Sequence, residues 1–146
     1  GRIEGPGKVI FANGTVYEGA FKDAKNHGKG KIIYLDGHSY DGDWYEGLKQ
    51  GIGLEIQPDG STYNGAFVAG RPHGKGELKL ANGFKYIGEW TDGEITGLGK
   101  ATYNNGNVYS GYLKKAQPHG VGKMIYISGR VFKGIWDNGK EKTPLM

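Results

Sequence analysis

Residues Tyr40–Tyr63 read YDGDWYEGLKQGIGLEIQPDGSTY and contain five glycines in 24 positions. Glycine loses more backbone entropy on folding than any other residue, which costs roughly 0.5–1 kcal/mol relative to alanine in a regular element. Neither a helix nor an ordinary strand of this length tolerates so many glycines. The stretch therefore predicts a fold that requires glycine at fixed places.

The same spacing recurs along the whole chain. An aromatic residue stands every 23 residues, at Tyr17, Tyr40, Tyr63, Tyr86, Tyr109 and Phe132. Counted from each of these as phase zero, glycine occupies phases 2, 11, 13 and 20 of every full repeat. A fifth column at phase 7 consists of Gly1, Gly47, Gly70, Gly93 and Gly139, and the five columns hold all 29 glycines. The chain is therefore a tandem repeat.

Rings and glycines share one face of each expected strand. Alternate residues of a strand point to the same side, so Tyr40, Gly42 and Trp44 line one face. Together with phase zero, the columns at phases 4 and 17 hold 15 of the 18 aromatic residues. We expect these rings to lie flat over bare glycine backbone, as in designed sheets. Rings that each bury ~150–250 Å² would then stabilise a sheet without a second layer.

The connections indicate hairpins. Six dipeptides separate one repeat from the next: Asn13-Gly14, Asp36-Gly37, Asp59-Gly60, Asn82-Gly83, Asn105-Gly106 and Ser128-Gly129. Asn-Gly and Asp-Gly favour two-residue type I′ turns, which need positive φ twice. The other connection, exemplified by Lys22–His27, is expected to be longer and polar. The predicted fold is all-β, an elongated single-layer antiparallel sheet of tandem 23-residue β-hairpins, with twelve strands spanning roughly 55 Å.

The repeat phase also sets the expected domain organisation. One repeat domain should span residues 1–139, with full repeats at 17–39, 40–62, 63–85, 86–108 and 109–131. Residues 1–16 supply only the second strand and turn of a repeat, and residues 132–139 the first strand of the last one. Residues 140–146 are expected to be a C-terminal tail, because Thr143 and Leu145 stand where glycines should. The chain has no initiator Met, so we expect it to be the C-terminal part of a longer array.

The pattern Tyr40-x-Gly42-x-Trp44-x-x-Gly47, then Gly51-x-Gly53 and Asp59-Gly60, resembles the MORN repeat (membrane occupation and recognition nexus). The resemblance covers nearly the whole chain and includes the pairs His27-Gly28, His73-Gly74 and His119-Gly120. Four residues depart from the ring and aliphatic columns: Glu55, Gln57, Leu80 and Leu113. The tryptophans and the His-Gly pairs each recur every 46 residues, which suggests a unit of two alternating hairpins.

Motifs for catalysis are absent from the sequence, so we predict no enzyme, cofactor or metal. The stretch Gly97-Leu-Gly99-Lys100 fails the Walker pattern, because Glu94 stands at the first glycine and Ala101 follows the lysine. His27, His73 and His119 lie two hairpins apart, ~19 Å by strand spacing, which is too far to share one ion. Each is instead expected to cap a loop. Carboxylate pairs such as Asp41 and Asp43 should be solvated surface.

Composition and charge limit the cellular compartment and the kinds of partner that this protein can have. Hydrophobic residues make up 36% of the chain, and there are no cysteines, which fits a reducing compartment. No apolar run is long enough for a membrane helix or a signal peptide. The net charge of +4 is too diffuse for a nucleic-acid partner. We therefore expect a cytoplasmic protein associated with the cytoskeleton or peripheral to the inner face of a membrane.

The first functional hypothesis is a scaffold that mediates protein–protein interaction. An exposed aromatic face would form a groove for a helical partner. The predicted groove residues are Tyr17, Phe21, Tyr34, Tyr40, Trp44, Tyr63, Phe67, Tyr86, Trp90, Tyr103, Tyr109, Tyr126, Phe132 and Trp136. The resemblance to protist cytoskeletal proteins made almost wholly of such repeats implies a homodimer, which we place at residues 109–146.

The alternative hypothesis is a phospholipid- or phosphoinositide-binding module for membrane attachment, which the family's name implies. A stripe opposite in parity to the glycines carries the candidate lipid-facing residues Lys8, Lys29, Lys31, Lys75, Lys100 and Lys123. Each lysine near an anionic leaflet contributes ~1 kcal/mol. Carboxylates such as Glu18 and Glu89 share this face, so a solvated lysine face is an equal explanation.

Two other functions fit less well. Aromatic cages for carbohydrate or quaternary ammonium groups occur in exported proteins with similar hairpins, but no export signal is seen. A calcium β-roll would need a nine-residue GGxGxD repeat, which this sequence lacks.

Overall fold

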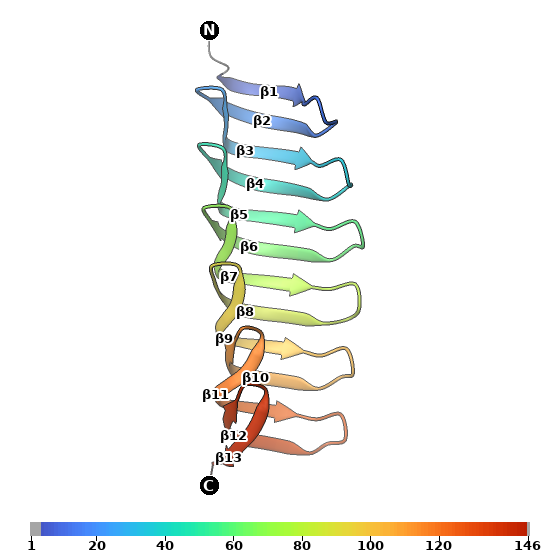
Figure 1. The fold of residues 1–146 in the computed structure, drawn as a ribbon, viewed down its shortest axis with the longest axis vertical. Coiled ribbons are helices and arrows are strands. Elements are labelled where there is room, and N and C mark those ends of the chain that lie inside the picture. The colour runs from blue at the N-terminus through green and yellow to red at the C-terminus, as the bar shows by residue number, and fades with distance from the viewer. Residues whose placement is uncertain (1–3, 146) are drawn as a thin grey trace. The chain divides into compact units, whose positions relative to one another are not determined.

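A computed structural model describes residues 4–145 and contains thirteen strands and no helix within that range (Figure 1). The strands are β1 (Gly5–Ile10), β2 (Val16–Lys22), β3 (Lys25–Ile33), β4 (Ser39–Tyr45), β5 (Leu48–Ile56), β6 (Thr62–Val68), β7 (Arg71–Lys79), β8 (Lys85–Thr91), β9 (Glu94–Thr102), β10 (Val108–Lys114), β11 (Gln117–Ile125), β12 (Val131–Asp137) and β13 (Lys140–Pro144). They form one antiparallel sheet in chain order. The all-β prediction is confirmed.

The chain divides into two compact units, one up to Arg71 and one from Pro72. Within each unit, consecutive strands lie side by side and the Asn-Gly or Asp-Gly connections project from the same side of the sheet (Figure 1). The expectation of a single repeat domain over residues 1–139 remains a prediction. Gly1 of the phase-7 column and Met146 of the expected tail lie outside the described residues.

The Asn-Gly and Asp-Gly connections are not two-residue type I′ turns. Between β3 and β4, the Gly37 amide donates to the Tyr34 carbonyl (3.0 Å) and the Tyr34 amide to the His38 carbonyl (2.9 Å). Gly37 has φ +97°, but Asp36 does not have a positive φ. This is a type I turn followed by a glycine bulge. Asp36 is favoured because its Oδ1 accepts the His38 amide hydrogen bond (2.9 Å), and the other five connections repeat this contact.

The true two-residue turns lie where the sequence predicted longer polar loops. In Lys22–His27, β2 and β3 are joined only by Asp23 and Ala24, which have φ of +51° and +64°. Two successive positive φ angles are the type I′ signature. The second turn residue is glycine at four of the six described turns and alanine at Ala24 and Ala116. The phase-7 glycine column is therefore a turn requirement.

Ala116 is strained for this reason, and Ala116→Gly should raise the free energy of unfolding by about 0.5 kcal/mol. Alanine pays a free-energy penalty for the left-handed conformation, which glycine does not. Glycine loses more backbone entropy on folding, so the net gain is smaller than that penalty. Its amide already donates to the Ile95 carbonyl at 2.8 Å, so the backbone geometry is set. Urea denaturation measures the change. The reverse substitution, Gly93→Ala at φ +85°, should destabilise, and a stabilised Gly93→Ala would contradict this account.

The question posed by the glycines in Tyr40–Tyr63 has a steric answer. The Tyr40 ring lies along the backbone of Gly53, and its hydroxyl donates to the Asp43 carbonyl at 2.7 Å. A Cβ added at Gly53 would overlap that ring. Tyr17, Tyr63, Tyr86 and Tyr109 make the same hydroxyl contact in their own repeats. At four positions of the phase-13 column, a tyrosine occupies the space that a side chain would need: Gly30, Gly53, Gly99 and Gly122.

The rings pack edge to face along each unit. Tyr40 contacts Trp44 of its own repeat and Phe67 of the next, both with ring centroids 5.1 Å apart. Tyr109 and Trp136 pack in the same way at 5.5 Å. Such pairs contribute about 0.5–1.5 kcal/mol beyond the area they bury. The rings therefore form the core of a sheet that has no second layer.

The 46-residue period of tryptophan also has a structural basis. The indole N–H groups of Trp44, Trp90 and Trp136 donate to glycine carbonyls of the preceding repeats, at 2.9, 3.2 and 3.1 Å. Phe21, Phe67 and Leu113, which alternate with them at phase 4, have no N–H donor in the side chain. The hairpins therefore alternate in polar contacts while sharing one backbone plan.

The buried tyrosines make the fold sensitive to alkali. Burial raises the pKa of Tyr63, Tyr86 and Tyr109 to about 12. An unfolded tyrosine ionises near 10, so the contribution of these tyrosines to stability should be constant below about pH 10 and fall as the pH rises to about 12. Urea midpoints across this range measure the fall. Tyr63→Phe should make the fall shallower, because phenylalanine does not ionise. Phe132 shows that the repeat accepts phenylalanine at this phase. An unchanged slope would contradict the prediction.

Residues 140–146 were expected to be a tail, but Lys140–Pro144 form β13. This strand pairs with β12, with Thr143 opposite Ile135 and Pro144 opposite Gly134. Main-chain hydrogen bonds do not require the glycines of the repeat, which is why pairing continues where the glycine phase is lost. The sheet pattern therefore extends further than the sequence repeat.

Candidate functional site

The predicted aromatic groove is mostly interior. Ten of its fourteen rings are buried, and Tyr17, Tyr40 and Tyr109 are 0% exposed. The ten are Tyr17, Phe21, Tyr40, Trp44, Tyr63, Phe67, Tyr86, Trp90, Tyr109 and Trp136. The other four, Tyr34, Tyr103, Tyr126 and Phe132, are half-buried. The expectation of an open ring-lined groove is therefore corrected for these ten, and partner contact by the remaining four stays a prediction.

Bulges explain why these rings are buried. In the repeat at residues 40–62, Gly42 pairs with Gly53 but Trp44 pairs with Lys49, so three residues lie opposite Asp43. Such bulges bend a strand. In this repeat Lys49, which precedes the bulge, lies over a ring, with its Nζ 5.0 Å from the Tyr40 ring centroid. Periodicity alone does not reveal this bend.

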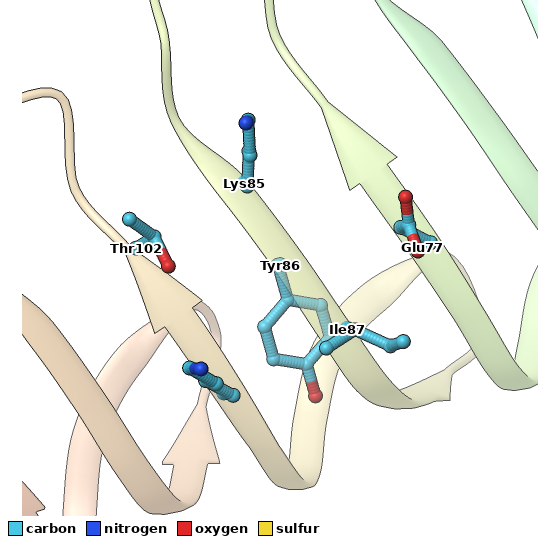
Figure 2. A pocket seen from close by; sticks show the side chains of 6 residues that line it. Glu77, Lys85, Tyr86, Ile87 and Thr102 are labelled. Atoms are coloured by element: carbon cyan, nitrogen blue, oxygen red, sulfur yellow. The ribbon is translucent and has the colours of Figure 1, made fainter.

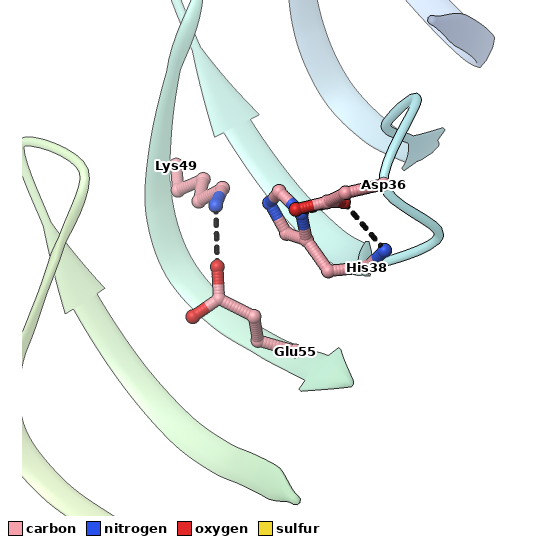
Figure 3. Close-up of polar contacts among 4 residues, drawn as sticks. All are labelled: Asp36, His38, Lys49 and Glu55. Carbon is pink, nitrogen blue, oxygen red and sulfur yellow. Dashed lines mark hydrogen bonds and ion pairs between the residues drawn. The ribbon is translucent and has the colours of Figure 1, made fainter. Parts of the chain in front are cut away.

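Glu55, which interrupts the aliphatic column, is neutralised within the chain. Its Oε1 lies 2.6 Å from Lys49 Nζ, and the two side chains are only 19% and 14% exposed (Figure 3). Lys49 also lies over the Tyr34 ring at 5.5 Å. Burial raises the pKa of Tyr40, and the nearby Asp43 and Glu55 carboxylates raise it further. This departure from the repeat is a paired, covered charge and offers no open acid–base group.

Figure 3 also shows the turn contact of Asp36, whose Oδ1 accepts from the His38 amide and lies 2.5 Å from the His38 imidazole Nδ1. The His38 amide, and then its imidazole, hold the pKa of Asp36 below its usual value. The pair is exposed and closes a turn.

The three histidines of the His-Gly pairs join successive turns. Nδ1 of His27, His73 and His119 accepts the backbone amide of the first turn residue of the next repeat, at 3.3, 3.1 and 3.2 Å. Gln50 and Thr96 accept the corresponding amides in the other repeats. The expected capping role is confirmed. Within residues 4–145, no group of three or more His, Asp or Glu could hold a metal ion.

His73→Ala should therefore lower the free energy of unfolding by about 1 kcal/mol, because the Asp92 amide loses its acceptor. His73→Gln is the matched control and should retain most of the stability, since Gln50 performs this role at 2.9 Å in repeat two. Thermal and urea unfolding of both variants measure the effect. Equal loss in both variants would show that ring packing, rather than the acceptor, matters.

The predicted lysine stripe lies on the opposite, outer face of the sheet, and all six lysines are exposed. In the unit up to Arg71, Lys29 forms an ion pair with Asp43 and holds the pKa of that carboxyl below its usual value. Lys8 and Lys31 both lie opposite Glu18. These lysines are therefore balanced by acids across the strands.

The outer face of the unit from Pro72 is different. Lys75 lies opposite Glu89, but Lys100 lies opposite Ile87 and Ser110, and Lys123 opposite Ser110 and Lys133. Lys100, Lys123 and Lys133 form no ion pair with another described residue. Residues 72–146 hold eleven basic and six acidic side chains, against eight and nine in residues 1–71. The net positive charge of the chain thus resides in this unit.

Exposed apolar side chains accompany these lysines, and the sequence analysis missed them. Leu98 and Val121 are 61% and 57% exposed, and Tyr112 and Ile135 are also exposed. Tyr112 lies opposite Leu98, and Val121 opposite Ile135, so the four form a row across β9–β12 that a bulge interrupts between Tyr112 and Val121. The sequence did contain a signal: phase 12 is lysine at Lys29 and Lys75 but apolar at Leu98 and Val121. The repeat pattern does not specify the residue at this phase, so the change was overlooked.

A hollow of about 190 Å³ opens on the same outer face. Glu77, Lys85, Tyr86, Ile87, Lys100 and Thr102 line it. Figure 2 shows Lys85 and Glu77 above Ile87, which is 54% exposed. Glu77 lies 3.1 Å from Lys79 Nζ, so Lys85 and Lys100 are left as the cations beside an apolar floor.

The comparisons agree with this architecture. The MORN repeat family matches residues 1–16, 17–39, 40–62, 63–85, 86–108 and 109–129. Comparison with curated proteins finds no significant sequence match. A solved structure with a similar fold is the TCP domain of SAS-4 (dCPAP) of Drosophila melanogaster, in complex with a proline-rich motif of Ana2 (dSTIL). It is 14% identical with a TM-score of 0.54, over 90% of this chain and 73% of that one.

None of residues 4–145 forms a helix long and apolar enough to cross a bilayer. The family match covers most of the chain and follows the 23-residue spacing seen in the sequence and the hairpins of the sheet. The chain therefore belongs to the MORN repeat family.

Proposed function

We propose that this chain is a non-catalytic scaffold module that binds a protein partner through the outer face of the unit from Pro72. The observation that carries the proposal is the row Leu98, Tyr112, Val121 and Ile135, which leaves apolar side chains exposed beside unpaired lysines. Exposed apolar patches of this kind mark interaction sites. The fold-related TCP domain, which is solved with a proline-rich motif of its own partner, supports a binding role for such sheets.

Affinity purification from cells that express the chain tests the proposal. Wild-type bait should recover proteins that a Val121→Glu/Ile135→Glu bait does not, because charge on the apolar row prevents its burial. Ile33→Glu/Ile52→Glu is the matched control, since both residues are exposed on the outer face of the other unit. Recovery that is the same with all three baits would contradict the proposed surface.

A finer part of the proposal is homodimerisation through residues 109–146. It is supported by β13, whose five residues are all exposed and which pairs with β12 alone among the described strands. An unpaired strand edge invites another strand. Light scattering behind size exclusion, over a wide range of concentration, measures the assembly. A monomer at every concentration would remove the dimer and leave the binding role intact.

The alternative function is attachment to anionic phospholipid, and the unpaired Lys100 and Lys123 favour it specifically. Association at the cytoskeleton or at the inner face of a membrane is the cellular setting that accompanies either role. Sedimentation with phosphatidylcholine–phosphatidylserine vesicles tests the alternative. Lipid attachment requires binding that falls steeply as salt rises and that Lys100→Gln/Lys123→Gln abolishes.

A further inference from the structure

Three parallel rows cover the outer face of β9–β12. The lysine row consists of Lys100, Lys123 and Lys133, with Ser110 between the first two. The Leu98 row on one side consists of Leu98, Tyr112, Val121 and Ile135. The Val108 row on the other side consists of Thr102, Val108, Ile125 and Val131. A line of positive charge therefore runs between the apolar Leu98 row and the Val108 row, which is apolar except for Thr102.

We propose that this three-row surface binds an acidic amphipathic helix of about three turns, supplied by the protein partner. The inference rests on the proposed scaffold function and specifies the class of partner. In the bound state the apolar stripe of the helix packs on the Leu98 row. An adjacent stripe of carboxylates faces the lysine row.

The dimensions of the surface suit a helix. Strands lie ~4.8 Å apart, so β9 to β12 span ~14 Å, which equals about ten residues of helix at 1.5 Å each. Neighbouring rows are separated by two residues of strand, ~6.7 Å. A helix of ~10 Å diameter thus contacts the Leu98 row and the lysine row together. Carboxylates at i and i+7 are ~10.5 Å apart, close to the two strand spacings between Lys100 and Lys123.

The charge pattern selects an acidic partner. Lys123 and Lys133 stand directly opposite each other across β11 and β12, and like charges in that register are unfavourable. No described carboxylate pairs with either of them. A carboxylate from a partner removes this repulsion. A second copy of this chain packed face to face by a two-fold axis would instead bring two lysine rows together, which disfavours self-association through this face.

Side-chain length disfavours a flat membrane as the occupant. A lysine side chain extends further from the sheet than valine, isoleucine or leucine. An anionic bilayer would therefore meet the ammonium groups first and leave both apolar rows uncovered. A helix is curved and carries its charges on one flank, so it reaches the Leu98 row and the lysine row together.

The test uses a synthetic helix as the probe. A fluorescein-labelled, side-chain-stapled peptide of about 14 residues carries leucines at i, i+3/i+4 and i+7 and glutamates in the adjacent stripe. Fluorescence anisotropy should show saturable binding to the full chain. Lys100→Gln/Lys123→Gln/Lys133→Gln should weaken binding at least tenfold. The matched control Lys8→Gln/Lys29→Gln/Lys31→Gln should leave it unchanged.

A second peptide, with glutamine in place of every glutamate, should bind at least tenfold more weakly than the first. Three results would overturn the inference: no binding of the glutamate peptide, equal binding of both peptides, or equal loss in the two lysine variants. Lysine-dependent binding of phosphatidylcholine–phosphatidylserine vesicles without peptide binding would also overturn it, in favour of lipid. The scaffold proposal is separately judged by affinity purification, since partners lost with Val121→Glu/Ile135→Glu but kept with the lysine variant would retain it.

Discussion

Replacing Tyr40 by alanine should lower the free energy of unfolding by about 4 kcal/mol, a large share of the stability of an ordinary domain. Tyr40 is 0% exposed, and its ring packs edge to face on Trp44 and Phe67. Its removal leaves a cavity beside Gly53, and the Asp43 carbonyl loses the hydroxyl group that donates a hydrogen bond to it. The loss is therefore one of packing and of polar contact together.

Two controls separate these contributions. Tyr40→Phe removes only the hydroxyl and should cost about 1 kcal/mol, and Phe132 shows that the repeat accepts phenylalanine at this phase. Tyr45→Ala should cost less than the loss at Tyr40, because Tyr45 is 55% exposed. Equilibrium urea unfolding measures all three variants. Similar losses for Tyr40→Ala and Tyr45→Ala would refute the assignment of the phase-zero rings to the core.

Gly53→Ala should cost about 3 kcal/mol, at the upper end of what overpacking costs in a core. Gly53 has no positive φ, so alanine is allowed by its backbone and the penalty comes from the collision with the Tyr40 ring. Gly60→Ala is the matched control. Its Cβ would meet no atom within 4 Å, and it should lose only about 1 kcal/mol from its φ of +92°.

The double variant Gly53→Ala/Tyr40→Ala tests the mechanism directly. Once the ring is absent, the added methyl group has space, so alanine at position 53 should cost little in that background. The two changes would then be strongly non-additive. Additive losses would mean that Gly53 is required for a reason other than the ring above it.

Several features could be predicted from the sequence because they depend on contacts within or between adjacent repeats. The alternation of Tyr40, Gly42 and Trp44 predicts a strand face, and the ring over glycine is found as expected. The capping role of His73 follows from its place beside a turn. Such local patterns recur every 23 residues, so each repeat supplies an independent instance of the same rule.

The sequence pattern predicted type I′ turns at the Asn-Gly and Asp-Gly connections, but these turns lie at the other connections. The prediction is wrong because Asn-Gly is compatible with more than one turn type. The decisive fact is the φ of the residue before glycine, which is positive at Glu46 but not at Asp36. A side chain that accepts the amide two residues later favours the type I form. The sequence contains both turn types at fixed phases, and hydrogen-bond geometry is needed to assign them.

The sequence by itself determined the repeat length, the strand parity and the placement of rings over glycines, because these follow from spacing. It also determined the match to the MORN repeat family. Tertiary structure decided which surface is free. Bulges bend the strands, Lys49 lies over the Tyr40 ring, and most of the predicted groove becomes the core. Cross-strand register decided the charge pattern, since Lys29 meets Asp43 whereas Lys123 meets Lys133. A side chain's partner across a sheet depends on which backbone atoms pair, and a repeat pattern read along one strand does not contain that information.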